Sequence, residues 1–520
     1  MSARWRSIAW ATVPCAATLY PRIMLLGGYP ATDEGIFAFA AQQAHLSLAA
    51  GLGLPDFWPL MAYPLLVSWV YAFDLNHFLL LRLVDMVVAL VVAALLYRVA
   101  AKESGSWVFG AIIAAIFTFT MNQHAFIQHG FKNSMFAAYI PLLWAAHIGL
   151  FGEQREGFRW WLCGVLVAIA VVLRETFVSF ALFGAIAILV GHGMRSLLQY
   201  VAAGLIAGTL LIGALLLMRG GMTEVLASYA VAGQLYAALD HLRWTYLAAA
   251  FSTAFREASP ALPWVLLGLA AIVFRFRREA SDPPVGRWLF WLGAALVPLT
   301  EPVMKIGFPY QIAVSLLGFC GLAALGWRRL ALAPHGVRLG VGIVATSLSL
   351  ALAWPQSGRL NQFFRERTLN NIKAFGGQQW PERSVSQSNY LLLAAAIQKA
   401  ASPAATLSTS GSMSALFPLT GLVPSSYRLH NLSETALALR SDPSALQQAI
   451  RDCPPDVIML TSRTDIPARE VISRAIAGLG EYSQVAMVPV AADKDYGSFG
   501  GVVYLRSSPS TCKTVPSPRR

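Results

Sequence analysis

The sequence has 520 residues, of which 56% are hydrophobic and only 12% are charged. Its mean hydropathy is +0.56. Ordinary soluble domains carry about 25% charged residues, so this chain cannot cover a water-exposed surface of its size. These values exclude a soluble enzyme, a disordered chain and a nucleic-acid-binding module. The net charge of +13 comes from basic clusters between apolar runs, a pattern typical of membrane topology.

Apolar runs of membrane-spanning length follow one another through residue 354. The first of them is interrupted by Pro21 and Arg22. Runs of roughly 17–25 residues predict spanning helices. The sequence therefore predicts a polytopic α-helical membrane protein with about eleven spans, near 7–28, 78–97, 105–121, 135–151, 160–175, 176–191, 198–218, 262–275, 286–299, 311–326 and 337–354.

Basic residues occur in alternate loops, which predicts the orientation. Arg98 and Lys102 lie in one such loop, and Arg328 and Arg329 lie in another. The positive-inside rule then places the N-terminus in the cytoplasm and the chain in the inner (plasma) membrane. This alternation requires that 57–73 does not cross. We expect 35–73 to form helices along the outer membrane surface instead.

After residue 354 the apolar runs shorten and polar residues become more frequent. Short predicted strands and helices alternate there, which favours an α/β domain over 355–506. An odd number of spans puts this domain outside the cytoplasm, in the periplasm of a Gram-negative cell. We expect 507–520 to be a disordered tail. Cys453 and Cys512 form either a disulfide or two free thiols. The strands are expected at 404–410, 456–462, 484–490 and 501–506, and the helices at 387–401, 442–452 and 467–479.

Two adjacent carboxylates, Asp33 and Glu34, follow the first predicted span and precede an apolar helix. One interpretation is helix capping, because a helix N-terminus favours an anion. The other is catalytic. A carboxylate at the membrane–water boundary is partly desolvated, which can raise its pKa toward neutrality and make it a general base. The residues alone leave both interpretations open.

The Asp33-Glu34 loop, the Pro-containing segment after it and Arg82-Leu83 together resemble the GT-C glycosyltransferases. The most similar branch contains protein O-mannosyltransferases and the bacterial transferases that add aminoarabinose to lipid A. The resemblance covers 1–354, with 29–73 as the first outer loop. It implies a catalytic acidic residue in that loop, a polyprenyl-phosphate sugar donor and an outer soluble domain after the bundle.

The second outer loop contains His129, Lys132 and Asn133. The family resemblance leads us to expect an acidic residue near the position that Asn133 occupies. An amide with neutral imidazoles does not make a site for a hard cation, so we expect no metal. His129 and Asn133 remain candidate substrate contacts. Lys132 is either a ligand of an anionic donor or a lysine that reaches the membrane surface.

Two later outer segments offer further cations. Arg174-Glu175 ends the fifth span, where charges are usually paired or functional. Either the two residues form an internal salt bridge, or Arg174 binds phosphate oxygens while Glu175 orients it. Lys305 and Tyr310 lie in a stretch that resembles the family's late outer loop, in which a lysine faces the donor phosphate. An interfacial lysine that binds no donor is the alternative for Lys305.

These observations predict an inverting hexosyl- or pentosyltransferase of the cell envelope. It would move a sugar from polyprenyl phosphate to an extracytoplasmic lipid, glycan or protein. In this hypothesis Asp33 and Glu34 are catalytic, and Lys305, Arg174 and Lys132 bind the donor phosphate. The sequence has no GxGxxG and no P-loop lysine, so we expect neither a nucleotide sugar nor a cofactor. A lipid-linked sugar flippase or transporter and an O-antigen-type polymerase or ligase are the alternatives.

Overall fold

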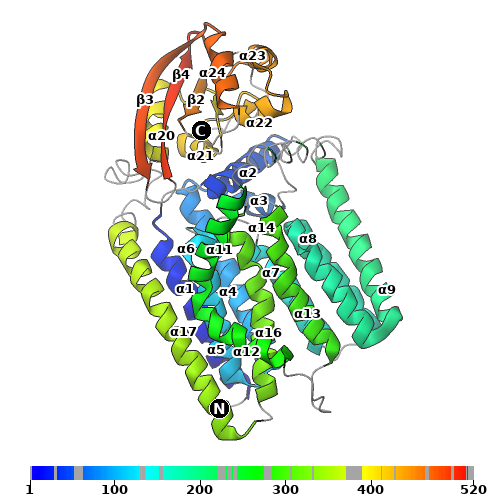
Figure 1. The fold of residues 1–520 in the computed structure, drawn as a ribbon. Helices are drawn as coiled ribbons and strands as arrows, with labels where there is room; N and C mark the ends of the chain where they lie inside the picture. The colour runs from blue at the N-terminus through cyan, green and yellow to red at the C-terminus, as the bar shows by residue number, and fades with distance from the viewer. Residues whose placement is uncertain are drawn as a thin grey trace.

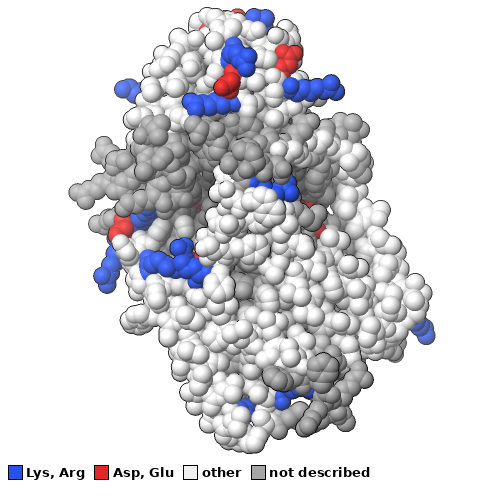
Figure 2. Space-filling view, in the orientation of Figure 1, with Lys and Arg blue, Asp and Glu red and all other residues white. Residues whose placement is uncertain are grey.

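The computed structural model is a long bundle of helices with a small α/β domain at one end and the N-terminus at the other (Figure 1). In the space-filling view most of the helical surface is white. Lys, Arg, Asp and Glu lie mainly on the α/β domain, in the zone beneath it and at the far end (Figure 2). The structure describes residues 3–28, 32–51, 62–128, 130–131, 135–151, 156–218, 226, 230, 233, 237, 243–273, 284–304, 307–330, 333–369, 389–411, 413–426, 429–462, 468–493, 497–510 and 512.

Helices cover the apolar runs that the sequence predicts as spans. The polytopic helical class is therefore confirmed, whereas the number of crossings stays a prediction. Five stretches in the described part of the chain are long and apolar enough to cross a membrane: His77–Ser104, Glu175–Met218, Arg243–Val273, Pro309–Leu330 and His335–Thr368. The bundle helices are α1 (Ala3–Leu25), α4 (His77–Ser104), α5 (Trp107–Met121), α7 (Met135–Phe151), α8 (Glu156–Leu173), α9 (Val178–Met218), α11 (Arg243–Ala258), α12 (Leu262–Val273), α13 (Val285–Leu296), α16 (Ser315–Leu330) and α17 (His335–Phe363).

Local sequence signals set several helix ends. The last turn of α4 ends at Gly105, which has a positive φ of 67°, and the Ser106 side chain then accepts a hydrogen bond from the Phe109 amide at the start of α5. Gly193 has a non-helical backbone conformation, with φ 80°, and forms a kink in α9. The kink lies where the sequence predicts the boundary between two spans. The expected interruption of the first span is absent, because α1 continues through Pro21.

Small residues let the bundle helices approach closely. Gly110 of α5 lies against the backbone of Ala101 in α4, and Gly318 of α16 lies against Ala294 and Ala295 of α13. Close backbone approach at such residues is a common basis of helix association in membranes, where the hydrophobic effect does not drive packing.

Short elements collect near the end of the bundle that faces the α/β domain, where they build the candidate site. Two other short elements follow bundle helices directly: η4 (Ser259–Ala261) follows α11, and η7 (Phe364–Thr368) follows α17. The short elements of the site are α2 (Thr32–Ala49), α3 (Ala62–Val67), η1 (Ser68–Ala72), α6 (His124–Ile127), η2 (Glu175–Phe177), η6 (Val297–Leu299), α14 (Thr300–Met304) and α15 (Pro309–Ala313).

The C-terminal domain contains a four-stranded sheet with the order β1-β2-β4-β3. Strands β1 and β2 are parallel, and β4 runs antiparallel to both β2 and β3. Asp442 caps α23 as its position before Pro443 predicts, with its Oδ1 accepting from the Ser444 amide at 2.9 Å. The elements are α20 (Asn389–Ala400), β1 (Leu407–Thr409), α21 (Leu416–Thr420), α22 (Leu432–Ala438), α23 (Pro443–Asp452), β2 (Val457–Thr461), α24 (Arg469–Ala477), β3 (Tyr482–Asp493) and β4 (Gly497–Arg506).

A disulfide joins Cys453 to Cys512, with 5.2 Å between their Cα atoms. The Ser510 amide donates to the Asp456 carboxylate. The sequence predicts a disordered tail over 507–520, but Ser510 and Cys512 in its first part contact the domain. Residues 513–520 lie outside the described residues. Disulfides persist in oxidising compartments, which accords with an extracytoplasmic location.

Replacing Cys453 and Cys512 together by alanine should lower the free energy of unfolding of the α/β domain by about 2–4 kcal/mol, because the bond restricts the unfolded chain. Thermal unfolding of the detergent-solubilised protein measures this loss, with proteolysis of the domain as the readout of its unfolding. Cys15→Ala, which changes a cysteine outside the disulfide, is the control. Equal melting temperatures for the double variant and the wild type would contradict the prediction.

Candidate functional site

A buried ion pair fixes the start of α2, beside Asp33. The Glu34 carboxylate accepts two hydrogen bonds from Arg82, from Nε at 2.6 Å and from Nη2 at 2.7 Å. Both side chains are 1% exposed. Arg82 also donates from Nη1 to the carbonyl oxygens of Leu26 and Gly28 at 2.7 Å. One guanidinium therefore holds the end of α1, the start of α2 and α4 in a single arrangement.

A second buried pair lies one turn further along α4. Arg22 donates to Asp85 at 2.9 Å, and its Nε donates to the Asn122 side-chain oxygen at 2.5 Å. The Tyr63 hydroxyl donates to the other Asp85 oxygen at 2.7 Å. Burial and the neighbouring Asp85 carboxylate raise the pKa of Tyr63 well above its usual range, so the hydroxyl stays protonated and remains a donor. Because Arg82 and Asp85 are three residues apart, they share a face of α4.

The third pair, Arg174 with Glu301, joins the end of α8 to α14. Arg174 Nη2 lies 3.3 Å from the Glu301 carboxylate, and Arg174 Nε donates to the Thr176 hydroxyl at 3.0 Å. Glu301 therefore pairs with Arg174 directly, and the orienting role expected for Glu175 stays a prediction. Neighbouring residues such as Arg174 and Glu175 point in different directions, whereas the fold brings Glu301 within reach.

The predicted site residues are partly described by the structure. Asp33 is half-buried, in the first turn of α2 beside Glu34. The ring of Tyr310 lies 5.9 Å from the Arg174 guanidinium. The other predicted contacts lie outside the described residues; they are His129, Lys132, Asn133 and Lys305. No group of His, Cys, Asp or Glu that could hold a metal occurs within the described ranges.

Two short helices bring the neighbourhoods of Lys132 and Lys305 together in the fold. Helix α6, on the N-terminal side of Lys132, packs against α15, on the C-terminal side of Lys305, and both contact α11. Phe131 lies 5.6 Å from the Tyr63 ring and 6.2 Å from the Phe37 ring. Phe131 of the second outer loop therefore lies against the two elements that carry Asp33 and Tyr63.

The α/β domain covers this end of the bundle by packing on α2 (Figure 1). The Phe39 ring stacks on Phe417 with a centroid separation of 4.3 Å, and it lies 5.6 Å from His430. Buried residues of α2 and α3 share one hydrophobic core with Tyr390, Leu407 and other residues of the domain. The helix that carries Asp33 and Glu34 in its first turn is therefore enclosed between the two parts of the protein.

The partners of these charges are not apparent from the sequence. There Arg22 is only an interruption of the first span, Arg82 is only part of the family resemblance, and Asp85 and Tyr63 have no predicted role. A general signal was present, because Arg22, Arg82 and Asp85 lie inside apolar spans. Charges at such positions are costly and are usually paired. The identity of each partner, however, depends on how the helices pack.

The sequence matches no protein-family model and no curated protein. The fold does match solved membrane proteins. A structure of ArnT from Cupriavidus metallidurans bound to undecaprenyl phosphate has a TM-score of 0.55 at 11% identity, over 100% of both chains. An Archaeoglobus fulgidus oligosaccharyltransferase tethered to an acceptor peptide has a TM-score of 0.53 at 11% identity, over 98% of this chain and 74% of that chain. Oligosaccharyltransferase AglB from the same organism, in complex with an inhibitory peptide and a dolichol-phosphate, has a TM-score of 0.51 at 10% identity, over 88% and 69%.

This chain shares its fold with ArnT and with the archaeal oligosaccharyltransferase, which are GT-C proteins. The resemblance stated from Asp33-Glu34 and Arg82-Leu83 is confirmed at the level of the fold, which is what similarity at these identities establishes. The match extends over the whole chain, so it includes the C-terminal domain as well as the helical bundle.

Glu34→Ala should destabilise the protein by about 3–5 kcal/mol, because it leaves the Arg82 guanidinium buried without its carboxylate. Thermal unfolding in detergent measures the loss. Asp74→Ala is the matched control, because Asp74 is an exposed carboxylate before α4 and its removal should change stability by less than about 0.5 kcal/mol. A melting temperature of Glu34→Ala equal to that of the control would show that the pair does not hold this end of the bundle.

Proposed function

We propose that this protein is an inverting glycosyltransferase that transfers a sugar from a polyprenyl-phosphate donor to an extracytoplasmic acceptor. The fold supports this proposal, since proteins with the same fold have been solved with undecaprenyl phosphate or with a dolichol-phosphate bound. The observation that carries it is the place of Asp33. This half-buried carboxylate stands next to a buried ion pair, on a helix enclosed between the bundle and the α/β domain.

In the proposed reaction the acceptor hydroxyl oxygen attacks the anomeric carbon, on the face opposite the phosphate. The bond between this carbon and the phosphate oxygen breaks, and its electron pair leaves with the polyprenyl phosphate. Asp33 takes the hydroxyl proton as general base. The transition state has oxocarbenium character, so positive charge grows on the sugar while negative charge grows on the departing phosphate.

Glu34 acts in this proposal as a positioning residue. Its two carboxylate oxygens already face Arg82, so they hold the first turn of α2 and leave the acceptor proton to Asp33. The Arg82 guanidinium is similarly occupied by Glu34 and by two backbone carbonyl oxygens. We therefore assign the donor phosphate to cations of the second and late outer loops.

Lys305 is the main phosphate ligand in this proposal, and Lys132 assists it. Arg174 shares its charge with Glu301, which lowers its net attraction for an anion, although it still lies beside Tyr310. Preorganised cations stabilise negative charge that develops on a leaving group. The same contacts bind the donor in its ground state, so they contribute to affinity as well as to rate.

Asp33→Asn should reduce transfer by roughly 10²–10⁴-fold while donor retention is unchanged, because the amide cannot accept a proton at neutral pH. Lys305→Ala should weaken both retention and turnover, since a phosphate contact acts in the ground state and in the transition state. Transfer assays and mass spectrometry of the retained lipid on purified variants separate the two effects.

Asp74→Asn is the control for the loss of a carboxylate at the same end of the bundle, and it should keep the wild-type rate within about twofold. Asparagine caps a helix as well as aspartate does, so a mere capping role predicts that Asp33→Asn is active. Transfer by Asp33→Asn at more than about a tenth of the wild-type rate, a loss of only ~1.4 kcal/mol, would remove Asp33 from the mechanism.

We propose further that the α/β domain is extracytoplasmic and that the N-terminus is cytoplasmic. The basic loops support this orientation, and so does the disulfide between Cys453 and Cys512. Alkaline phosphatase fused after residue 400 should be active, and fusions within 276–286 should be inactive. The reverse pattern would place Asp33 on the cytoplasmic side and would contradict the proposed donor orientation.

A further inference from the structure

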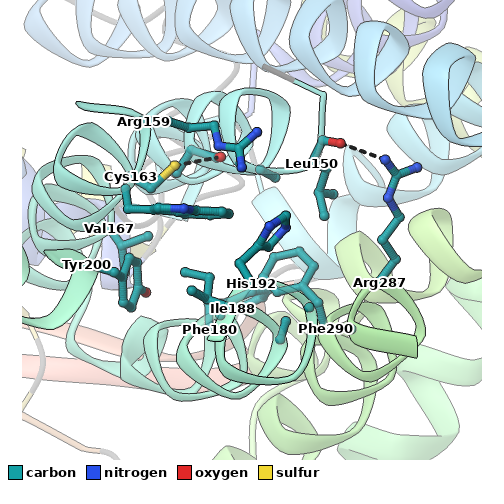
Figure 3. A pocket seen from close by; sticks show the side chains of 18 of the residues that line it. Leu150, Arg159, Cys163, Val167, Phe180, Ile188, His192, Tyr200, Arg287 and Phe290 are labelled. Carbon is teal, nitrogen blue, oxygen red and sulfur yellow. Dashed lines mark hydrogen bonds between the residues drawn. The ribbon is translucent and has the colours of Figure 1, made fainter. Parts of the chain in front are cut away.

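A cavity of about 150 Å³ lies between α7, α8, α9 and α13 (Figure 3). Apolar side chains form most of its wall, among them Leu142, Ala146, Val167, Ile188 and Phe290. A cavity of this size and character can accept an apolar group about as large as a benzene ring. The space therefore suits part of a hydrocarbon chain rather than a polar solute.

The cavity is remote from the candidate active site. It is lined by Arg159, near the start of α8, and by Arg287, near the start of α13. The opposite end of α8 leads to Arg174, which pairs with Glu301 just beyond α13. At 1.5 Å per residue, Arg159 and Arg174 are about 22 Å apart along the chain axis. The two sites therefore lie at opposite ends of the same helices.

Cationic and polar groups stand at the rim of the cavity. The Arg159 guanidinium lies over the Trp160 ring at 4.4 Å, and the His192 ring lies 4.7 Å from that of Trp160. Arg287 donates to the Leu150 carbonyl oxygen at 2.6 Å and approaches Glu103 at 3.5 Å. In Figure 3 His192 lies between Arg159 and Arg287. Arg159 and Arg287 are therefore the cations that line this rim, and Glu103 offsets part of the charge of Arg287.

A buried N–H donor in the cavity wall has no hydrogen-bond acceptor among the described residues. Trp160 is 3% exposed and lines the cavity. Its Nε1 is buried without a hydrogen-bond partner in the structure. A buried N–H group left without a partner is unfavourable. A ligand that fills the apolar space and also carries a carbonyl oxygen near the rim would satisfy it.

We propose that this cavity binds an anionic glycerophospholipid from the leaflet around this end of the bundle. One acyl chain enters the cavity, an ester carbonyl oxygen accepts from Trp160 Nε1, and the phosphate lies against Arg159. Leu182 and Leu189 on α9 are 58% and 41% exposed, and the rest of the chain follows this apolar surface. The bound lipid packs the α8–α9 pair against α13.

The chemistry of the rim selects the ligand class. A soluble phosphate ester would meet Arg159 but leave the apolar space empty. A zwitterionic lipid would fill the space, but its cationic headgroup would approach Arg159, and like charges repel. An anionic lipid matches both the wall and the rim. This inference depends only on the membrane location of the bundle, so it stands apart from the proposed transferase activity.

The test compares lipids and variants of the full-length protein purified in dodecyl maltoside. Native mass spectrometry counts the bound lipid, and thermal unfolding reports stabilisation by phosphatidylglycerol, by phosphatidylcholine with the same acyl chains, or by glycerol 3-phosphate. We expect phosphatidylglycerol to raise the melting temperature most and glycerol 3-phosphate to leave it unchanged, because a ligand of the native state stabilises it by mass action.

Two variants probe the two halves of the site. Arg159→Gln removes the cation, and Ala146→Leu occupies the apolar space. Each should reduce retained phosphatidylglycerol roughly tenfold, the effect of losing one charge-assisted hydrogen bond or its equivalent. Arg195→Gln is the matched control, because Arg195 is exposed on α9 and does not line the cavity. It should keep the wild-type amount within about twofold.

Three results would overturn the proposal. The first is equal retention of phosphatidylglycerol by the wild type and by both Arg159→Gln and Ala146→Leu. The second is equal stabilisation by phosphatidylcholine, which would describe a purely apolar site. The third is a polyprenyl phosphate as the lipid that these variants lose, which would assign the cavity to the donor.

Discussion

The ion pair between Glu34 and Arg82 holds together the elements on which the candidate site depends. A buried guanidinium is stable only when its donors are satisfied. Arg82 achieves this with one carboxylate and two carbonyl oxygens. Those acceptors belong to the end of α1 and to the start of α2. The direction in which the chain leaves α1, and therefore the position of Asp33, follows from this one set of hydrogen bonds.

The neighbouring pairs extend the same arrangement through the bundle. Arg22 and Asp85 connect α1 to α4 and, through Asn122 and Tyr63, to the residue after α5 and to α3. Arg174 and Glu301 connect α8 to the segment after α13. Each pair includes a charge that would be unfavourable in lipid if it stood alone. Paired, these charges connect helices from distant parts of the sequence while their net charge stays small. The α/β domain completes the arrangement by burying the apolar face of α2.

The two ends of the bundle have different chemical character. The end near the α/β domain contains short helices and paired charges, among them the Glu34–Arg82 pair beside Asp33. At the other end, the starts of α8 and α13 frame an apolar cavity with arginines at its rim. Because α8 contributes to both sites, a ligand that holds α8 and α9 against α13 also supports the helix that presents Arg174. The physical link is the rigidity of a helix, whose backbone hydrogen bonds fix one end relative to the other.

Periodicity and composition alone determined the helical membrane class, the positions of the long helices and the α/β character predicted for 355–506, because these follow from local patterns that repeat along the chain. The cap at Asp442 and the kink at Gly193 likewise follow from local sequence. The family resemblance rested on the short motifs around Asp33 and Arg82, and it correctly indicated the fold. Only the tertiary structure decided that Arg82 faces Glu34, that Arg22 faces Asp85 and that Arg174 faces Glu301. Those pairs join residues 48, 63 and 127 positions apart, and no local pattern specifies which of several charges meet when helices pack.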